Sequence, residues 1–159
     1  MAGANHSELM QVAIALSLES MRSQNGGPYG AVVTKDGKII GKGMNLVTVN
    51  NDPTAHAEML AIREACQTLN SWKLEGCELY TSCEPCPMCM AAVYWARLDR
   101  VYYANSKEDA ANYGFGSQTI YQELGLPIPQ RKLPMHQIMQ PEAEVAFQEW
   151  AAKPDKQLY

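Results

Sequence analysis

The sequence reads TAHAE from Thr54 to Glu58 and CEPCPMC from Cys83 to Cys89, and each stretch stands where a loop is predicted to become a helix. Two cysteines three residues apart in a first helical turn can present both sulfurs on one side, where the positive end of the helix dipole favours thiolates. One histidine would complete three zinc ligands and leave a fourth position for water, as in catalytic sites. We therefore predict one catalytic zinc ion per subunit, with Glu58 moving protons beside it.

Spacing alone does not choose between the two cysteine pairs, Cys83 with Cys86 or Cys86 with Cys89. A Cys-x-x-Cys pair can also be a redox pair or two buried thiols, and Cys83 could complete a closed structural site with three cysteines and one histidine. The order H-x-E followed by P-C-x-x-C matches the signature of zinc nucleobase deaminases. That match favours His56, Cys86 and Cys89 as the ligands.

Helical and strand patterns alternate along the rest of the chain. Apolar residues recur at helical spacing after Asn5, which is predicted to cap the first helix, and Asp36-Gly37 separates two β-rich runs as in a hairpin. We predict helices over residues 5–23, 55–69, 85–97 and 118–124 and after Pro141, and strands over residues 31–34, 38–43, 77–81, 100–104 and 135–139, with Asp52 capping the second helix. This alternation predicts an α/β fold, a three-layer α/β/α sandwich around a five-stranded mixed sheet.

The composition is that of one globular domain over residues 1–159, and it narrows the classes of function. A net charge of −4 without any lysine or arginine run weighs against nucleic acid as a partner and favours a small-molecule substrate. The longest apolar run, residues 88–96, is far shorter than the roughly 20 residues that cross a bilayer. The absence of a readable signal peptide and the crowding of three cysteines favour a cytoplasmic protein with reduced thiols. His6 and His136 lack metal-like spacing and are expected to be ordinary surface or core residues.

Further motifs extend a family pattern along nearly the whole chain: GGPYGAVV (residues 26–33), Asn45, NDPTAHAE (51–58), YTSCEPCPMC (80–89), YWAR (94–97) and the C-terminal Tyr159. With them the chain resembles the cytidine-deaminase superfamily and, within it, the bacterial guanine deaminases. The resemblance implies a five-stranded sheet flanked by helices, zinc bound by His56, Cys86 and Cys89, and a proton shuttle at Glu58. It also implies a homodimer in which the C-terminal helix and tail, residues 140–159, are exchanged between subunits.

The same resemblance implies the reaction and the way in which the substrate is held. An amino-substituted nucleobase is deaminated hydrolytically, and guanine would give xanthine and ammonia. Asn45 corresponds to a side chain that holds the purine, the backbone amide of Ala57 to a contact with the base, Tyr29 and Trp95 to pocket walls, and Tyr159 to a residue that closes the partner's pocket. Taken without the resemblance, Asn45 could equally be a turn residue, and Tyr29 and Trp95 could be core residues.

The chain departs from the guanine deaminase pattern at Gly116-Ser117, where that family usually carries acidic residues, one of which faces the purine. Guanine presents N–H donors, which a carboxylate suits better than a hydroxyl does. Glu108 and Asp109 lie nearby in the sequence, but their ordinary interpretation is a solvated helix start. Another purine, a pterin, a triazine or a pyrimidine therefore stays an alternative substrate.

Two alternatives lie further from guanine deamination. A tRNA adenosine deaminase shares the zinc signature, but RNA binding needs cations, and the C-terminal helix instead carries Glu142, Glu144 and Glu149. A non-catalytic, zinc-stabilised binding module would use Cys83 as a fourth ligand. Such a closed site would leave Glu58 without a chemical role.

Overall fold

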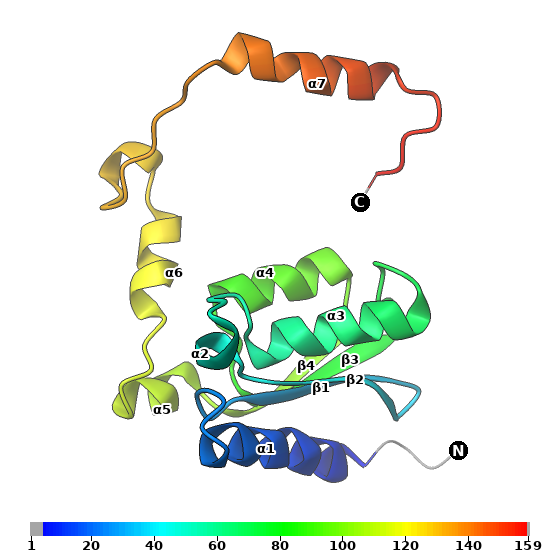
Figure 1. The fold of residues 1–159 in the computed structure, drawn as a ribbon, viewed down its shortest axis with the longest axis vertical. Coiled ribbons are helices and arrows are strands. Elements are labelled where there is room, and N and C mark those ends of the chain that lie inside the picture. Colours follow the sequence, from blue (N-terminus) through cyan, green and yellow to red (C-terminus); the bar gives the residue numbers. More distant parts are fainter. Residues whose placement is uncertain (1–4, 159) are drawn as a thin grey trace. The chain divides into compact units, whose positions relative to one another are not determined.

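The structure is a computed structural model that describes residues 5–158, and the chain divides into two compact units after Ser117. The first unit contains the helices α1 (His6–Arg22), α2 (Val47–Asn50), α3 (Ala57–Leu69), α4 (Pro87–Ala96) and α5 (Lys107–Asn112) and the strands β1 (Gly30–Lys35), β2 (Lys38–Met44), β3 (Cys77–Cys83) and β4 (Arg100–Asn105). The second contains α6 (Gln118–Gly125), a short 3-10 helix (Ile128–Gln130) and α7 (Gln140–Ala152). Figure 1 labels the helices and strands along the chain.

A sheet in the order β2-β1-β3-β4 forms the middle of the first unit. β1 pairs antiparallel with both β2 and β3, whereas β3 pairs in parallel with β4, as the crossover through α4 requires. α1 covers one face of the sheet, and α3 and α4 cover the other (Figure 1). The predicted three-layer arrangement with a mixed sheet is therefore present in this unit.

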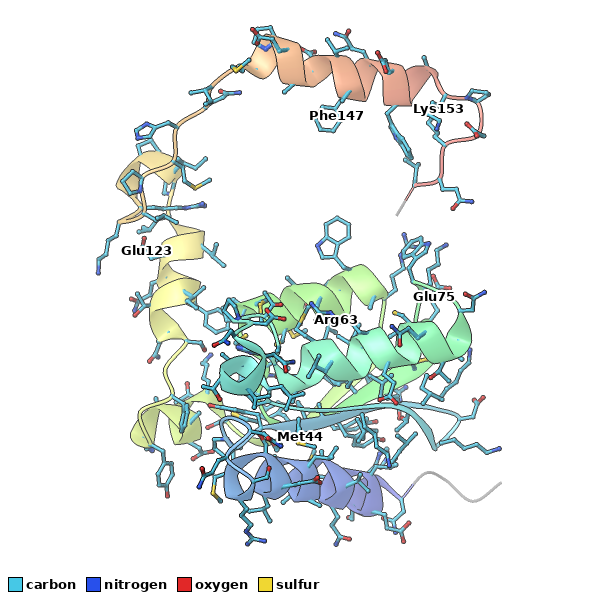
Figure 2. All side chains as sticks on the ribbon, in the orientation of Figure 1. Met44, Arg63, Glu75, Glu123, Phe147 and Lys153 are labelled. Carbon is cyan, nitrogen blue, oxygen red and sulfur yellow. The ribbon has the colours of Figure 1, made fainter. Side chains whose placement is uncertain are left out.

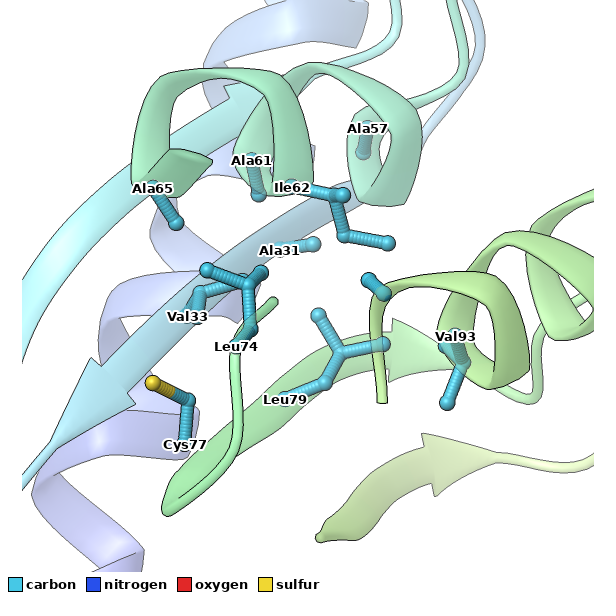
Figure 3. Packing of buried hydrophobic residues seen from close by; sticks show 11 residues of the cluster. Ala31, Val33, Ala57, Ala61, Ile62, Ala65, Leu74, Cys77, Leu79 and Val93 are labelled. Carbon is cyan, nitrogen blue, oxygen red and sulfur yellow. The ribbon is translucent and has the colours of Figure 1, made fainter. Parts of the chain in front are cut away.

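The central strand β1 separates two cores, because successive side chains of a strand point to opposite faces. Ala31 and Val33 are fully buried in the larger core, together with residues of α3 and α4 (Figure 3). Val32 packs on the other face with Leu9 of α1 and with Tyr80 of β3. The larger core holds α3 and α4 side by side on the same face of the sheet.

The hairpin and the first helix begin and end as the local signals predict. Asp36 and Gly37 have φ angles of 50° and 74°, which is the left-handed pair that a two-residue type I′ turn needs. The Asn5 side chain accepts a hydrogen bond of 3.4 Å from the Glu8 amide and so caps α1. These features depend only on neighbouring residues, which explains why the sequence predicts them.

The start of the second predicted helix is wrong. The carboxylate of Asp52 accepts hydrogen bonds from the Thr54 amide and hydroxyl, at 2.8 and 2.7 Å, and so closes a turn instead of capping a helix. His56, which follows this turn, has extended backbone, and α3 begins only at Ala57.

The predicted fifth strand is also wrong. The sheet has four strands, and residues 135–139 pair with no strand within the described part of the chain. The apolar residues of this segment, Met135, Ile138 and Met139, do not alternate with polar ones as in a half-buried strand. Met139 has a left-handed φ of 54°, which is not a strand conformation, and α7 begins at the next residue.

The second unit contains no buried residue among those that the structure describes. The side chain of Arg131 donates hydrogen bonds to the carbonyls of Leu126 and Leu124, at 2.9 and 3.3 Å, and so holds the end of α6. On α7 the Phe147 side chain projects from the helix and is 75% exposed (Figure 2). Within residues 5–158, the helices are too short or too polar to cross a membrane.

Candidate active site

His56 and Cys86 occupy the same position in two helices, since each is an N-cap residue with extended backbone. Neither side chain caps its own helix, so both remain available for another partner. Cys89 lies in the first turn of α4 and Glu58 in the first turn of α3. The positive ends of both helix dipoles favour anionic groups at these four positions.

Three potential ligand atoms meet where the two helices begin. The Nδ1 atom of His56 lies 3.6 Å from the Sγ atom of Cys86 and 3.5 Å from that of Cys89. A tetrahedral zinc ion at about 2.05 Å from nitrogen and about 2.3 Å from sulfur separates those atoms by about 3.6 Å. The spacing therefore fits zinc. Among the residues that the structure describes, no other group of His, Cys or acidic side chains has this compactness.

The two thiols are electrostatically unequal. A hydrogen bond from Cys89, assisted by His56, lowers the pKa of Cys86 to about 4 despite its partial burial. Donation of that same bond raises the pKa of Cys89, and burial raises it further. At neutral pH Cys86 is therefore a thiolate that attracts a cation, and metal binding would displace the proton of Cys89.

Glu58 is buried directly beside these ligands, with 5% of its surface exposed. Burial raises the pKa of its carboxyl, against hydrogen bonds from its own backbone N–H and from Cys89, and the charge of Cys86 adds to the rise. A carboxyl group whose pKa lies above its ordinary value is suited to accept and return a proton.

Cys83 points to a different partner. Its thiol donates to the carbonyl oxygen of Ser106 at 3.7 Å, and burial raises its pKa to about 11. The residue stays protonated at neutral pH and does not belong to the three-ligand group. This arrangement favours the open site over a closed one with four protein ligands.

Asn45 ties a second loop to the site. Its Oδ1 atom accepts hydrogen bonds from the backbone N–H groups of Gly27 and Val47, both at 3.3 Å. The backbone N–H of Asn45 donates to the Tyr29 carbonyl at 3.0 Å. The hydroxyl of Ser20 donates to the Asn45 carbonyl at 2.8 Å. The buried Asn45 therefore holds residues 26–29 through the bonds expected of a turn residue.

Tyr29, in this loop, lies close enough to the ligand group for its charges to affect the phenol. Burial raises the pKa of its phenol to about 12, and the charges of Cys83, Glu58 and Cys86 contribute. Its ring meets the edge of Phe115, with the ring centroids 5.5 Å apart and the planes at 90°. Tyr29 and Phe115 thus form an aromatic corner near the ligand group.

The family comparison agrees with this geometry. The sequence profile of the cytidine and deoxycytidylate deaminase zinc-binding region matches residues 4–105, a range that includes His56, Glu58 and both paired cysteines. The chain belongs to this deaminase family. The deaminase is also 47% identical to the guanine deaminase of Bacillus subtilis over 155 residues, which cover 98% of this chain and 99% of the relative.

A second type of relative matches a smaller part of the deaminase. The tRNA-specific adenosine deaminase of Aquifex aeolicus is 53% identical over 77 residues, which cover 48% of this chain and 51% of the relative. The similarity to the tRNA enzyme is therefore local, whereas that to the Bacillus subtilis guanine deaminase extends over both chains.

Solved structures place the deaminase among the same proteins. The crystal structure of the Bacillus subtilis guanine deaminase has a TM-score of 0.94 and 47% identity, with 98% of this chain and 99% of that one covered. The guanine deaminase of Nitrosomonas europaea has a TM-score of 0.67 and 30% identity, covering 74% and 68%. A protein solved in complex with 2,6-diaminopurine has a TM-score of 0.68 and 32% identity, covering 72% and 64%. The fold of the deaminase is therefore cytidine-deaminase-like.

The remaining predicted site residues lie in different surroundings. Ala57 is the first residue of α3, so its amide has no partner within the helix. Trp95 lies on α4 and is 63% exposed, so the core interpretation of this residue is wrong. Tyr159 lies outside the described residues.

His6 and His136 lie apart from the three-ligand group. The Nδ1 atom of His6 lies 2.7 Å from the hydroxyl of Tyr80, and His136 is exposed.

Sequence patterns do not single out Phe115 or Glu84 as neighbours of the site. The signal at Phe115 is its position between Gly114 and Gly116, but its contact with Tyr29 depends on how distant segments pack. Glu84 accepts a hydrogen bond of 3.1 Å from the Lys107 amide. It therefore joins the cysteine loop, residues 83–86, to α5. Nearby Asp109 belongs to the capping box of α5, which confirms the ordinary interpretation of that residue as part of a solvated helix start.

Proposed function

We propose that this deaminase converts guanine and water into xanthine and ammonia. The observation that carries the proposal is a buried carboxyl, Glu58, in the same helical turn as a zinc ligand and beside three donor atoms at zinc spacing. The extended similarity to the guanine deaminase of Bacillus subtilis supports guanine as the base.

The residues of the chain divide the chemistry between them. Zinc held by His56, Cys86 and Cys89 would supply a water molecule whose pKa is lowered to about 7, and hence a nucleophile at neutral pH. Glu58 accepts a proton from the attacking water and later delivers it to the departing amino nitrogen, which leaves as ammonia. Its burial supports both steps, because the carboxyl is shielded from exchange with bulk water.

The substrate contacts are proposed at five residues. The backbone N–H at Ala57 would donate to an acceptor on the base, and Asn45 would contact the purine through its Nδ2 group, since its Oδ1 atom serves the backbone. Tyr29 and Trp95 would form pocket walls, and Tyr159 would close the pocket of a partner subunit.

The test is ammonia release by the zinc-loaded protein from guanine, guanosine, adenine, cytosine, cytidine, pterins and triazines. We expect turnover of guanine. The matched control is Glu58→Gln, which keeps the shape of the side chain but cannot accept the proton. We expect this variant to retain its zinc and to lose at least about 100-fold in turnover.

The panel also separates the alternatives. Turnover of guanine would mean that other groups compensate for the absence of an acidic pair at Gly116-Ser117. Turnover of another ring, with guanine inert, would overturn the substrate and keep the zinc chemistry. Undiminished turnover by Glu58→Gln would remove Glu58 from the mechanism.

The functional unit is proposed to be a cytoplasmic homodimer. A reducing compartment suits the free thiols that hold the metal. The second unit exposes large apolar side chains, of which Phe147, Ile138 and Leu133 are 71–78% exposed, and a second copy of the chain would cover such surface. Exchange of residues 140–159 between subunits is the arrangement we propose.

A further inference from the structure

Phe115 makes a directed contact with Tyr29. The two rings meet at 90° with a centroid distance of 5.5 Å, which is the edge-to-face geometry that aromatic pairs favour. Gly27 lies under the same corner, where an added Cβ atom would come within 3.2 Å of the Tyr29 ring and 3.6 Å of the Phe115 ring. The corner is therefore closely packed on the side of residue 27.

Phe115 is held in place by α5. Its amide donates to the Ala110 carbonyl at 3.0 Å, and the preceding Gly114 amide donates to the Ala111 carbonyl at the same distance. These bonds fasten the backbone before the ring to the end of the helix, although the Phe115 side chain itself is 44% exposed. Its position follows from that of α5.

The other end of α5 is fastened to the cysteine loop. The Glu84 carboxylate accepts from the Lys107 amide at 3.1 Å and pairs with the Lys107 ammonium group at 3.8 Å. The Glu84 amide donates to the Asn105 carbonyl at 2.8 Å. Glu84 stands two residues before the ligand Cys86, so α5 fixes Phe115 relative to the loop that carries the metal ligands.

Tyr29 contacts Phe115 and also interacts with the reacting groups. Its ring is in electrostatic reach of Glu58 and Cys86, and its carbonyl is bonded to the Asn45 amide at 3.0 Å. If Tyr29 is a wall of the base site, a base that enters the site would meet its ring. The ring also packs against the larger core, so loss of Phe115 would remove one of its supports without altering Glu58 or the ligands.

We propose that Phe115 is a positioning residue, which holds the Tyr29 ring in the orientation that binds a planar amino-substituted base. The inference rests on the proposed function, because it assigns Tyr29 to the wall of the base site. An aromatic pair of this kind contributes to binding and orientation. Its loss should therefore raise the KM and leave kcat nearly unchanged.

The test compares Phe115→Ala, Phe115→Tyr and Tyr113→Ala in the full-length, zinc-loaded protein. Tyr113 is the matched control, since it is aromatic, 83% exposed and only two residues away. Phe115→Ala is expected to raise the KM for guanine and the Kd for 2,6-diaminopurine, measured by calorimetry, about three- to tenfold. Phe115→Tyr should restore both constants to their wild-type values. Zinc content and kcat should change less than about twofold in every variant, and so should the KM and Kd of Tyr113→Ala.

The outcomes distinguish this inference from the proposed function. Wild-type constants in Phe115→Ala, or equal losses in Phe115→Ala and Tyr113→Ala, would overturn the role of Phe115 while guanine turnover stands. Loss of zinc or a fall in kcat alone would also overturn it, because either points to a structural effect on the site. If guanine is inert but Phe115→Ala weakens the binding of 2,6-diaminopurine, the substrate is wrong and the positioning role holds. Failure of the wild type to bind or turn over any ring of the panel would refute both.

Discussion

At the scale of single residues, Cys83 and Cys86 stand three positions apart and meet different partners. Cys86 contacts His56, whereas Cys83 donates to the backbone carbonyl of Ser106. The difference in their surroundings also separates their charges, because the pKa of Cys86 falls to about 4 and that of Cys83 rises to about 11. Of these two cysteines, only Cys86 is a thiolate at neutral pH.

This difference predicts the metal content of two matched variants. Cys86→Ser should lose its zinc, because a hydroxyl is a poor replacement for a thiolate ligand. Cys83→Ser should keep one equivalent of zinc, since its side chain serves only as a donor to a carbonyl. Metal analysis of the two dialysed proteins measures the result. Zinc loss in Cys83→Ser would favour a structural site with four protein ligands.

At the scale of elements, the first turn of α3 lies directly on β2. A methyl group at Gly43 would collide with the carbonyl oxygen of Ala57, and it would lie 2.8 Å from the amide nitrogen of Ala61. Because both obstacles belong to backbone, no side-chain rotation can relieve the clash. The close approach of α3 to β2 sets the position of its first turn, which carries Glu58 and directly follows His56.

Gly43→Ala should therefore destabilise the protein by about 1–3 kcal/mol and weaken zinc binding, because α3 must shift away from the sheet. Gly125→Ala is the control, since a Cβ atom there would meet no other atom within 4 Å. Urea unfolding gives the stability, and a competing chelator gives the zinc affinity. Equal stability of the two variants would contradict this account of the helix position.

The capping box of α5 makes its stability depend on pH. Hydrogen bonds from the Ser106 backbone N–H and hydroxyl, both at 2.8 Å, lower the pKa of the Asp109 carboxyl. The folded pKa lies below the unfolded one, so the contribution is present above the unfolded pKa and is lost as the pH falls through the folded pKa.

Asp109→Asn should accordingly destabilise the protein near pH 7 and should differ less from the wild type in acid. The measurement is urea unfolding of both proteins between pH 7 and about pH 3. Glu108→Gln, one residue earlier and outside the box, serves as the control. A gap between Asp109→Asn and wild type that is constant over this range would contradict the assigned carboxylate role.

At the scale of the whole molecule, burial is unevenly distributed along the chain. No described residue after Ala96 is buried, although α7 carries the large apolar residues Val145, Phe147 and Trp150. A free monomer would leave these side chains in water. Association through the second unit would remove them from water and stabilise its helices.

The full-length protein should sediment as a dimer, and Phe147→Asp should shift it towards monomer, because a charge would enter an apolar contact. Glu149→Gln, on the same helix, should remain dimeric. Equilibrium sedimentation over a range of concentrations checks both expectations. A monomeric wild type would remove the exchanged C-terminal segment from the proposal, and with it the contribution of Tyr159 to a partner's pocket.

Features that depend on neighbouring residues were the most predictable from the sequence. The turn at Asp36-Gly37 follows from the backbone preferences of two residues, and the spacing of Cys86 and Cys89 follows from one helical turn. The chemistry of the site was predictable from a signature, because the order H-x-E followed by P-C-x-x-C is that of zinc nucleobase deaminases. Such rules also have limits. The predicted strand over residues 135–139 and the cap at Asp52 were wrong, since extended backbone needs a pairing partner and a carboxylate can close a turn instead.

The spacing of Cys86 and Cys89, the alternation of helices and strands and the hairpin follow from the sequence alone, because each depends on residues that are close together in the chain. The fold was needed to show that Cys83 turns away to Ser106, that Asn45 holds the loop of Tyr29, and that Phe115 meets that ring edge-on. These contacts join residues 16 to 86 positions apart in the chain. Their distances are set by the packing of α3, α4 and α5 around the sheet, which no local preference encodes.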